Sequence, residues 1–158
     1  MTKIILGIDP GLVNTGWGVI SKENNTYKFL GCGTIITDAK EDIALRIRDI
    51  NVQLNKVIDS YSIDEAAVEE TFVNKNSLTS LKLGHARGAI ILTVSLADIP
   101  IAEYSATNVK KAVTGTGRAE KGQVESMIKI LLPKATVKTE HEADALAVAI
   151  THGNTNRY

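Results

Sequence analysis

Cysteine is almost absent from this chain, and so are long apolar runs and an excess of charge of one sign. The single thiol, Cys32, cannot form an internal disulfide, which indicates a reducing compartment. The longest apolar stretch, roughly residues 89–97, is too short to cross a bilayer and contains Thr93 and Ser95. Lys3 is followed at once by a strand-like run rather than by a leader peptide. We therefore expect a cytoplasmic protein.

The zero net charge by itself argues against nucleic-acid binding, but the charges are unevenly distributed. Residues 1–70 carry 7 Lys and Arg against 11 Asp and Glu, residues 71–138 carry 10 against 4, and residues 139–158 carry 1 against 3. If folding joins the two ends, an acidic spot lies beside a basic surface, as a metal-using nuclease requires. Ordinary solvated charge explains the same counts equally well.

The length of 158 residues fits one domain with a sizeable core, and no repeat or linker divides the chain. We therefore expect a single domain over residues 1–158. Strands are predicted at 3–8, 15–21 and 27–37, which short polar turns would join into an antiparallel meander. Asp38, with Glu41 three residues on, is the expected cap of a first helix.

The rest of the chain alternates between strand and helix patterns. Two more strands are predicted at 65–69 and 101–104, and helices at 77–98, 105–113, 119–132 and 140–151. This order predicts an α/β fold with a mixed five-stranded sheet, three antiparallel strands followed by parallel crossovers, and helices on both faces. It resembles the element order of RNase H-like domains.

Acidic residues stand where two of these strands end. Asp9 ends the first strand, and Glu69 or Glu70 ends the strand at 65–69. Neighbouring strand ends can converge on one site. A single acid at a strand exit more often caps a turn or is solvated, so these residues need a further partner.

The last helix supplies such partners in His141 and Asp144, which share one face at i, i+3 spacing. Thr139 and Glu142 form a capping box, so Glu142 has a structural role. Three carboxylates and a histidine around one point are costly without cations, because the carboxylates repel one another. Two divalent ions would do so, and oxygen-rich ligands favour Mg²⁺ or Mn²⁺, with the histidine making Mn²⁺ more plausible.

Five stretches resemble the RuvC family of Holliday-junction resolvases in order and spacing. They are LGIDPG at 6–11, VEETF at 68–72, LKLGHARG at 81–88, AEK at 119–121, and the segment from EADALA to Thr151 and His152 at 142–152. The resemblance covers essentially the whole chain. It implies an RNase H-like endodeoxyribonuclease that resolves four-way junctions by paired nicks in recombination and repair. It also implies divalent metal, a homodimer, and work alongside RuvA and RuvB.

The same resemblance assigns the acidic residues. Asp9 and Glu69 match the first two catalytic, metal-binding acids, and Asp144 matches the last. His141 stands where an aspartate is commoner in the family; some relatives have histidine there, so it is kept as a ligand. Glu140 or Glu142 is the possible substitute. The family alignment selects Glu69, and alternation along the strand puts its neighbour on the opposite face.

Basic residues cluster around the flexible loop at 115–117. These are Lys110, Lys111, Arg118 and Lys121, of which Lys110 and Lys121 match junction-binding positions of the family. Such groups neutralise phosphates. The alternative is solvated surface charge.

Further DNA contacts are expected just after the strand that carries Glu69. Lys82 and Arg87 are candidates there, and the resemblance makes Phe72 the aromatic that stacks on an unpaired base, with core packing as the alternative. Trp17 is interpreted as a packing residue, and the flanking Gly16 and Gly18 as leaving room for a substrate strand.

Residues 89–97 are apolar around much of the helix, so one face should cover the sheet and another should meet a partner. A C2 dimer would match the symmetry of a four-way junction.

Three other functions compete with this interpretation. An actin-like kinase shares the Asp-x-Gly turn followed by Thr15 and Gly16, but it needs a second domain. A YqgF-type RNA-processing nuclease would share the acids but not LKLGHARG and AEK. A catalytically inactive junction-binding protein is the third, and His141 keeps it open.

Overall fold

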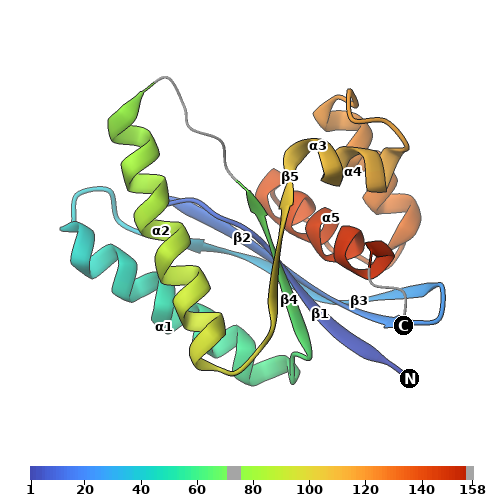
Figure 1. Cartoon of the computed structure of the whole chain (residues 1–158), viewed down its shortest axis with the longest axis horizontal. Coiled ribbons are helices and arrows are strands. Elements are labelled where there is room, and N and C mark those ends of the chain that lie inside the picture. The colour runs from blue at the N-terminus through green and yellow to red at the C-terminus, as the bar shows by residue number, and fades with distance from the viewer. Residues whose placement is uncertain (71–75, 156–158) are drawn as a thin grey trace.

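A five-stranded mixed sheet forms the centre of the molecule (Figure 1). The computed structural model describes residues 1–70 and 76–155, except for the side chain of Lys121. The strands are β1 (Lys3–Asp9), β2 (Asn14–Glu23), β3 (Thr26–Ile36), β4 (Glu65–Glu70) and β5 (Ile101–Ser105), in the order β3-β2-β1-β4-β5. The pairs β1–β2 and β2–β3 are antiparallel, and β1–β4 and β4–β5 are parallel. The predicted sheet is confirmed.

Helices cover both faces of this sheet, as predicted (Figure 1). One face carries α1 (Ile43–Tyr61) and α2 (Ser77–Leu96), and the other carries α3 (Ala106–Thr114), α4 (Lys121–Leu131) and α5 (Glu140–Thr155). Leu6 and Ile8 of β1 belong to the core under α1 and α2, whereas Ile5 belongs to the core under α5. Burial on both faces explains the nearly continuous apolar run in this strand.

The predicted start of the first helix is wrong. Asp38 does not cap it, because its carboxylate accepts a hydrogen bond from the backbone N–H of Lys40 at 2.9 Å and closes a local turn. Helix α1 begins only at Ile43, after Asp42. Aspartate side chains compete with helices in this way by bonding to nearby backbone groups.

Helix α2 is capped by Asn76, whose side chain accepts from the backbone of Leu78 and Thr79. Ile90 is fully buried, whereas Leu92 is 57% exposed. The apolar second half of α2 therefore has one face on the sheet and another in solvent. No helix among the described residues is long and apolar enough to cross a membrane.

Candidate metal centre

The carboxyl ends of β1 and β4 bring Asp9 and Glu69 next to each other. The last pair in the parallel register is Ile8 with Val68, so Asp9 and Glu69 follow one residue later on neighbouring strands. Val68 belongs to the core under α1 and α2, so side-chain alternation directs Glu69 to the α5 face and Glu70 to the opposite one. This register favours Glu69 as the site residue.

Helix α5 approaches this strand end closely because glycines lie beneath it. A Cβ atom at position 16 would overlap the carbonyl group of His141. A Cβ atom at position 7 would overlap the carbonyl of Ala145 and lie 2.6 Å from the backbone nitrogen of Ala149. Small alanines on α5 add to this close approach. The glycines beside Trp17 were interpreted as room for a substrate strand; α5 occupies that room instead.

The close approach brings His141 into contact with Asp9. The Nδ1 atom of His141 lies 3.2 Å from Oδ2 of Asp9, and their side chains are 32% and 16% exposed. Asp9 pairs with Gly16 across the β1–β2 ladder. The glycine that leaves room for the close approach of α5 therefore lies directly beside Asp9. Two groups 132 residues apart in the chain thus meet at the carboxyl end of β1.

Two threonines hold the loop after Asp9, a role that was not predicted for either from the sequence. Thr15, which is fully buried, donates its hydroxyl to the carbonyl of Gly11 at 2.6 Å and accepts from the N–H of the same residue at 3.3 Å. The backbone N–H of Thr37 donates to the carbonyl of Val13 at 3.0 Å. The loop is therefore fixed at both ends, and with it the position of the aspartate.

Asp144 lies one turn further along α5 than His141 and is partly buried. Residues three apart on a helix have Cβ atoms about 5–6 Å apart. Among the side chains that the structure describes, no group of three or more His, Cys, Asp or Glu residues is close enough together to hold a metal ion. Of the four predicted site residues, the described contacts join Asp9 and His141 directly.

The Asp9–His141 pair nevertheless fits a divalent cation. Adjacent ligands of an octahedral ion with bonds of about 2.1 Å are about 3.0 Å apart. The observed separation of 3.2 Å between Nδ1 and Oδ2 is close to that value. One carboxylate and one imidazole suit Mn²⁺ and are compatible with Mg²⁺.

Glu142 is occupied by backbone contacts. Its Oε2 accepts from the N–H groups of Lys138 at 2.7 Å and Thr139 at 3.2 Å, and the Thr139 hydroxyl accepts from the N–H of Glu142 at 3.2 Å. The predicted capping box is confirmed. Burial, together with the negative charge of Glu142, raises the pKa of the nearby Cys32 thiol to about 11. Glu142 therefore has the structural role expected of it.

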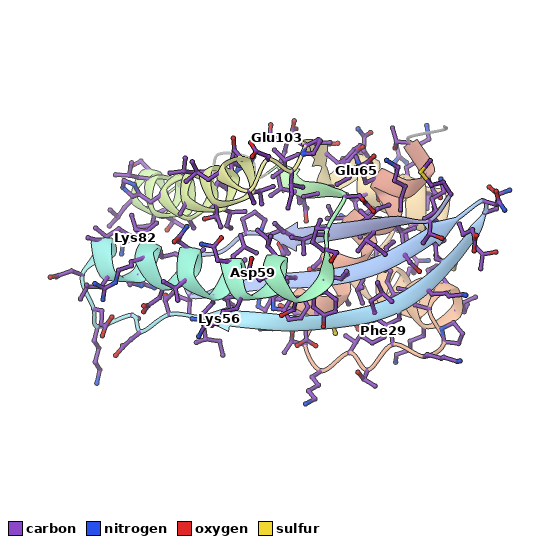
Figure 2. The ribbon with its side chains drawn as sticks, turned by 90° about the horizontal axis from the view of Figure 1, so that it is seen from below. Phe29, Lys56, Asp59, Glu65, Lys82 and Glu103 are labelled. Atoms are coloured by element: carbon purple, nitrogen blue, oxygen red, sulfur yellow. The ribbon has the colours of Figure 1, made fainter. Side chains whose placement is uncertain are left out.

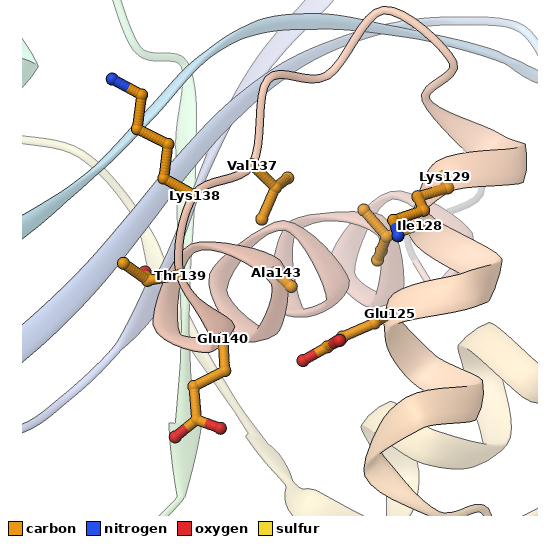
Figure 3. A pocket seen from close by; sticks show the side chains of 8 residues that line it. All are labelled: Glu125, Ile128, Lys129, Val137, Lys138, Thr139, Glu140 and Ala143. Carbon is orange, nitrogen blue, oxygen red and sulfur yellow. The ribbon is translucent and has the colours of Figure 1, made fainter.

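A small cavity of about 180 Å³ lies between α4 and the first turn of α5 (Figure 3). Glu125 and Lys129 of α4 line it together with Glu140 of α5, and Val137 and Ala143 add apolar surface. None of the four predicted site residues lines this cavity.

The predicted DNA-binding residues near α3 and α4 fall into two groups. Lys111 and Arg118 are exposed, and Lys110 is half-buried. Helix α3 ends at Gly115, whose positive φ of 87° starts the loop that carries this basic cluster. The side chain of Lys121 lies outside the described part of the chain.

The candidates after β4 differ in their surroundings. Lys82 is exposed on α2. Arg87 donates to the carboxylate of Glu103 on β5 at 2.5 Å, and its side chain is 16% exposed (Figure 2 labels Lys82 and Glu103). Phe72 lies outside the described residues.

A mixed five-stranded sheet with helices on both faces, and acids at the ends of its first and fourth strands, defines an RNase H-like domain. The model of one protein family, crossover junction endodeoxyribonuclease RuvC, matches residues 5–152. The chain belongs to the RuvC family.

Individual relatives agree with this assignment. A RuvC protein of Xanthobacter autotrophicus is 52% identical over 95% of this chain and 89% of its own length. One of Methylorubrum extorquens is 50% identical over 95% of this chain and 79% of its own length. A structure of T. thermophilus RuvC in complex with a Holliday junction substrate superposes with a TM-score of 0.89 at 31% identity, covering 96% of this chain and 93% of the other.

Proposed function

We propose that this protein is a divalent-metal-dependent endonuclease that resolves four-way DNA junctions by paired nicks in recombination and repair. The proposal is based on the contact between Asp9 and His141, which lies beside Glu69 at the carboxyl ends of β1 and β4. Membership of the RuvC family supports it, as does the likeness to a RuvC protein solved with a Holliday junction.

Asp9, Glu69, His141 and Asp144 are proposed as the catalytic and metal-binding residues for two Mg²⁺ or Mn²⁺ ions per subunit. When bound, the ions would activate a water molecule and stabilise the leaving oxygen. The contacts of Thr15 with Gly11 hold the loop that follows Asp9. Hydrolysis would leave 5′-phosphate and 3′-hydroxyl ends, and no residue is required as a covalent nucleophile.

The DNA would run over the basic residues that follow β4. Lys110, Lys111, Arg118 and Lys121 around the α3–α4 loop would neutralise phosphates. Lys82 on α2 is a further phosphate contact. Phe72 is proposed to stack on a base. Arg87 would first have to leave Glu103 or act while paired with it.

A homodimer is proposed through α2. Four exposed leucines and the exposed His85 follow one stripe at spacings of three, four, seven and four: Leu78, Leu81, His85, Leu92 and Leu96. A groove of about 460 Å³ between α1 and α2 adjoins this stripe and is lined in part by Leu92 and His85. A C2 dimer would present two identical sites to a two-fold symmetric junction. RuvA and RuvB are the expected partners, in the cytoplasm.

The experiment is nicking of a synthetic four-way junction in Mg²⁺ or Mn²⁺. The wild-type protein should nick two opposing strands, and Asp9→Asn should abolish nicking and weaken Mn²⁺ binding. Asp59→Asn is the matched control, because Asp59 is an exposed aspartate near the end of α1, which leads into the start of β4 rather than its carboxyl end (Figure 2 labels Asp59). Equal nicking by Asp9→Asn and wild type would contradict the proposal.

Two other outcomes would favour the competing functions. Cleavage of single-stranded RNA in preference to junctions would indicate an RNA-processing nuclease. Junction binding without nicking in either metal would indicate an inactive junction-binding protein.

A further inference from the structure

A second buried polar group holds the other end of α5. The Nε2 atom of His152 lies 2.7 Å from Oε2 of Glu65, the first residue of β4, and Nδ1 lies 2.8 Å from the hydroxyl of Tyr104 on β5. Lys3 of β1 adds an ion pair with Glu65 at 3.4 Å. His152 is 4% and Glu65 8% exposed, so these directional contacts are shielded from water. Figure 2 labels Glu65 where β4 begins.

His141 and His152 lie on the same face of α5. Eleven residues make three turns, so the two side chains point within about 20° of each other and about 16 Å apart along the axis. Each meets a carboxylate of the sheet, Asp9 at the end of β1 and Glu65 at the start of β4. Ile5 pairs with Glu65, so the two carboxylates are separated by four strand residues, about 13 Å. Both contacts form at once only at one position of the helix along the sheet.

Much of the packing between these two points is made by small residues. The sheet presents Gly7, Gly16 and Gly18 to α5: Ala145 and Ala149 lie against Gly7, the backbone of His141 lies against Gly16, and the Leu146 side chain lies against Gly18. Interdigitating side chains normally fix how one element sits along another. Leu146 inserts against Gly18, and the other contacts pair glycines with alanine or helix backbone and have shallow ridges, so directional hydrogen bonds at the ends add to that task.

We infer that His152, held by Glu65 and Tyr104, is a positioning residue that sets where α5 lies along the sheet and thereby brings His141 to Asp9. Tyr104 also connects His152 to β4, the strand that carries Glu69, because Tyr104 pairs with Glu69 in the β4–β5 register. The inference deepens the proposed function and depends on it for the metal, but the positioning itself is a property of the protein alone.

The opposing possibility is that local contacts at the start of α5 suffice. Thr139 and Glu142 form a capping box there, and the hydroxyls of Thr34 and Thr139 lie 3.0 Å apart. If these contacts position His141 by themselves, loss of His152 would lower stability and leave the site unchanged.

The test is histidine ring NMR of the metal-free protein at fixed pH. The chain has only three histidines, so the ring signals of His141 can be assigned with single substitutions. His152→Ala should move the His141 Nδ1 signal, because its distance to Asp9 changes. His152→Gln, whose amide can still donate to Glu65, should largely restore it. Tyr27→Phe is the matched control, since Tyr27 bonds to Asn154 at the same end of α5 but outside the buried group.

A Mn²⁺ titration followed by the electron paramagnetic resonance of free Mn²⁺ gives the second measurement. His152→Ala should lower the Mn²⁺ affinity about tenfold, as outer residues that orient metal ligands commonly do. Tyr104→Phe, which removes one hydroxyl, should lower it by a smaller factor, and His152→Gln and Tyr27→Phe should bind like wild type. If His152→Ala does not fold, Tyr104→Phe decides the question by the same two measurements.

Unchanged His141 signals and unchanged Mn²⁺ affinity in folded His152→Ala or Tyr104→Phe would overturn the inference. The proposed function fails separately, if wild-type protein binds no Mn²⁺ or binds it equally well after Asp9→Asn. In that case the NMR signals of His141 still decide whether His152 positions it.

Discussion

The carbonyl group of His141 fills the space that the Cβ atom of any residue other than glycine would need at position 16. Because Gly16 pairs with Asp9 on the neighbouring strand, this one missing side chain allows the histidine and the aspartate to meet. The geometry of the candidate metal centre thus depends on a residue that takes no part in binding or chemistry.

Gly16→Ala should therefore damage both stability and activity. Backbone atoms rather than a flexible side chain would have to move, so we expect a loss near the upper end for overpacking, about 3 kcal/mol. Chemical denaturation gives the stability, and Mn²⁺ binding reports on the site. Gly122→Ala is the control, because open space surrounds Gly122 in α4 and the change should be neutral or stabilise by about 0.5–1 kcal/mol. Equal stability of the two variants would refute the close approach of α5.

Two acids of α5 should respond in opposite ways to removal of their charge. Glu142→Gln weakens the hydrogen bonds from Lys138 and Thr139, so the free energy of unfolding should fall by about 1–2 kcal/mol. The nicking rate of Glu142→Gln per folded molecule should stay close to that of the wild type. Asp144→Asn should keep the stability and lose nicking. Denaturation curves and junction-nicking assays on both variants check this, and lost nicking in folded Glu142→Gln would return Glu142 to the list of metal ligands.

Local patterns in the sequence predicted the elements well. The run at β1 is apolar on both sides because both of its faces are buried. The capping box of Thr139 and Glu142 was also readable, since it involves residues only three apart. Asp38 failed as a cap because two local hydrogen-bonding patterns compete for the same side chain.

What the sequence could not provide was the register between distant segments. That Gly16 lies under His141 follows only once β1, β2 and α5 are assembled. The contact of His152 with Glu65 joins residues 87 positions apart, and no local spacing predicts it. Asp9 and His141 were brought together in the prediction by family resemblance and by the chemistry of their side chains, not by a pattern in the chain.

The Cys32 thiol should react slowly with alkylating reagents. Burial and Glu142 raise its pKa from 9.0 to about 11, so at pH 8 the thiolate is about 100-fold scarcer than in an unfolded chain. A thiolate of higher pKa is intrinsically about tenfold more nucleophilic, which leaves a rate about tenfold lower. Labelling rates of folded and urea-unfolded protein between pH 7 and 10.5 measure this.

The same shift makes stability depend on pH. Folding favours the protonated thiol, so this contribution is complete below pH 9 and declines as the pH rises toward 11. Cys32→Ser should flatten that decline. A labelling rate that levels off below pH 9 would contradict the raised pKa.

Leu92→Glu should convert the proposed dimer to a monomer. Leu92 is 57% exposed on α2 and lines the groove beside α1, so a charge there costs little in the monomer but would be buried without a partner in the proposed interface. Sedimentation velocity at micromolar concentration gives the mass, and circular dichroism shows that the fold is kept. Ile130→Glu is the matched control, because Ile130 is 69% exposed on α4, away from α2, and should leave the mass unchanged. A wild-type monomer, or a dimer that survives Leu92→Glu, would remove α2 as the interface and leave the exposed leucines without a function.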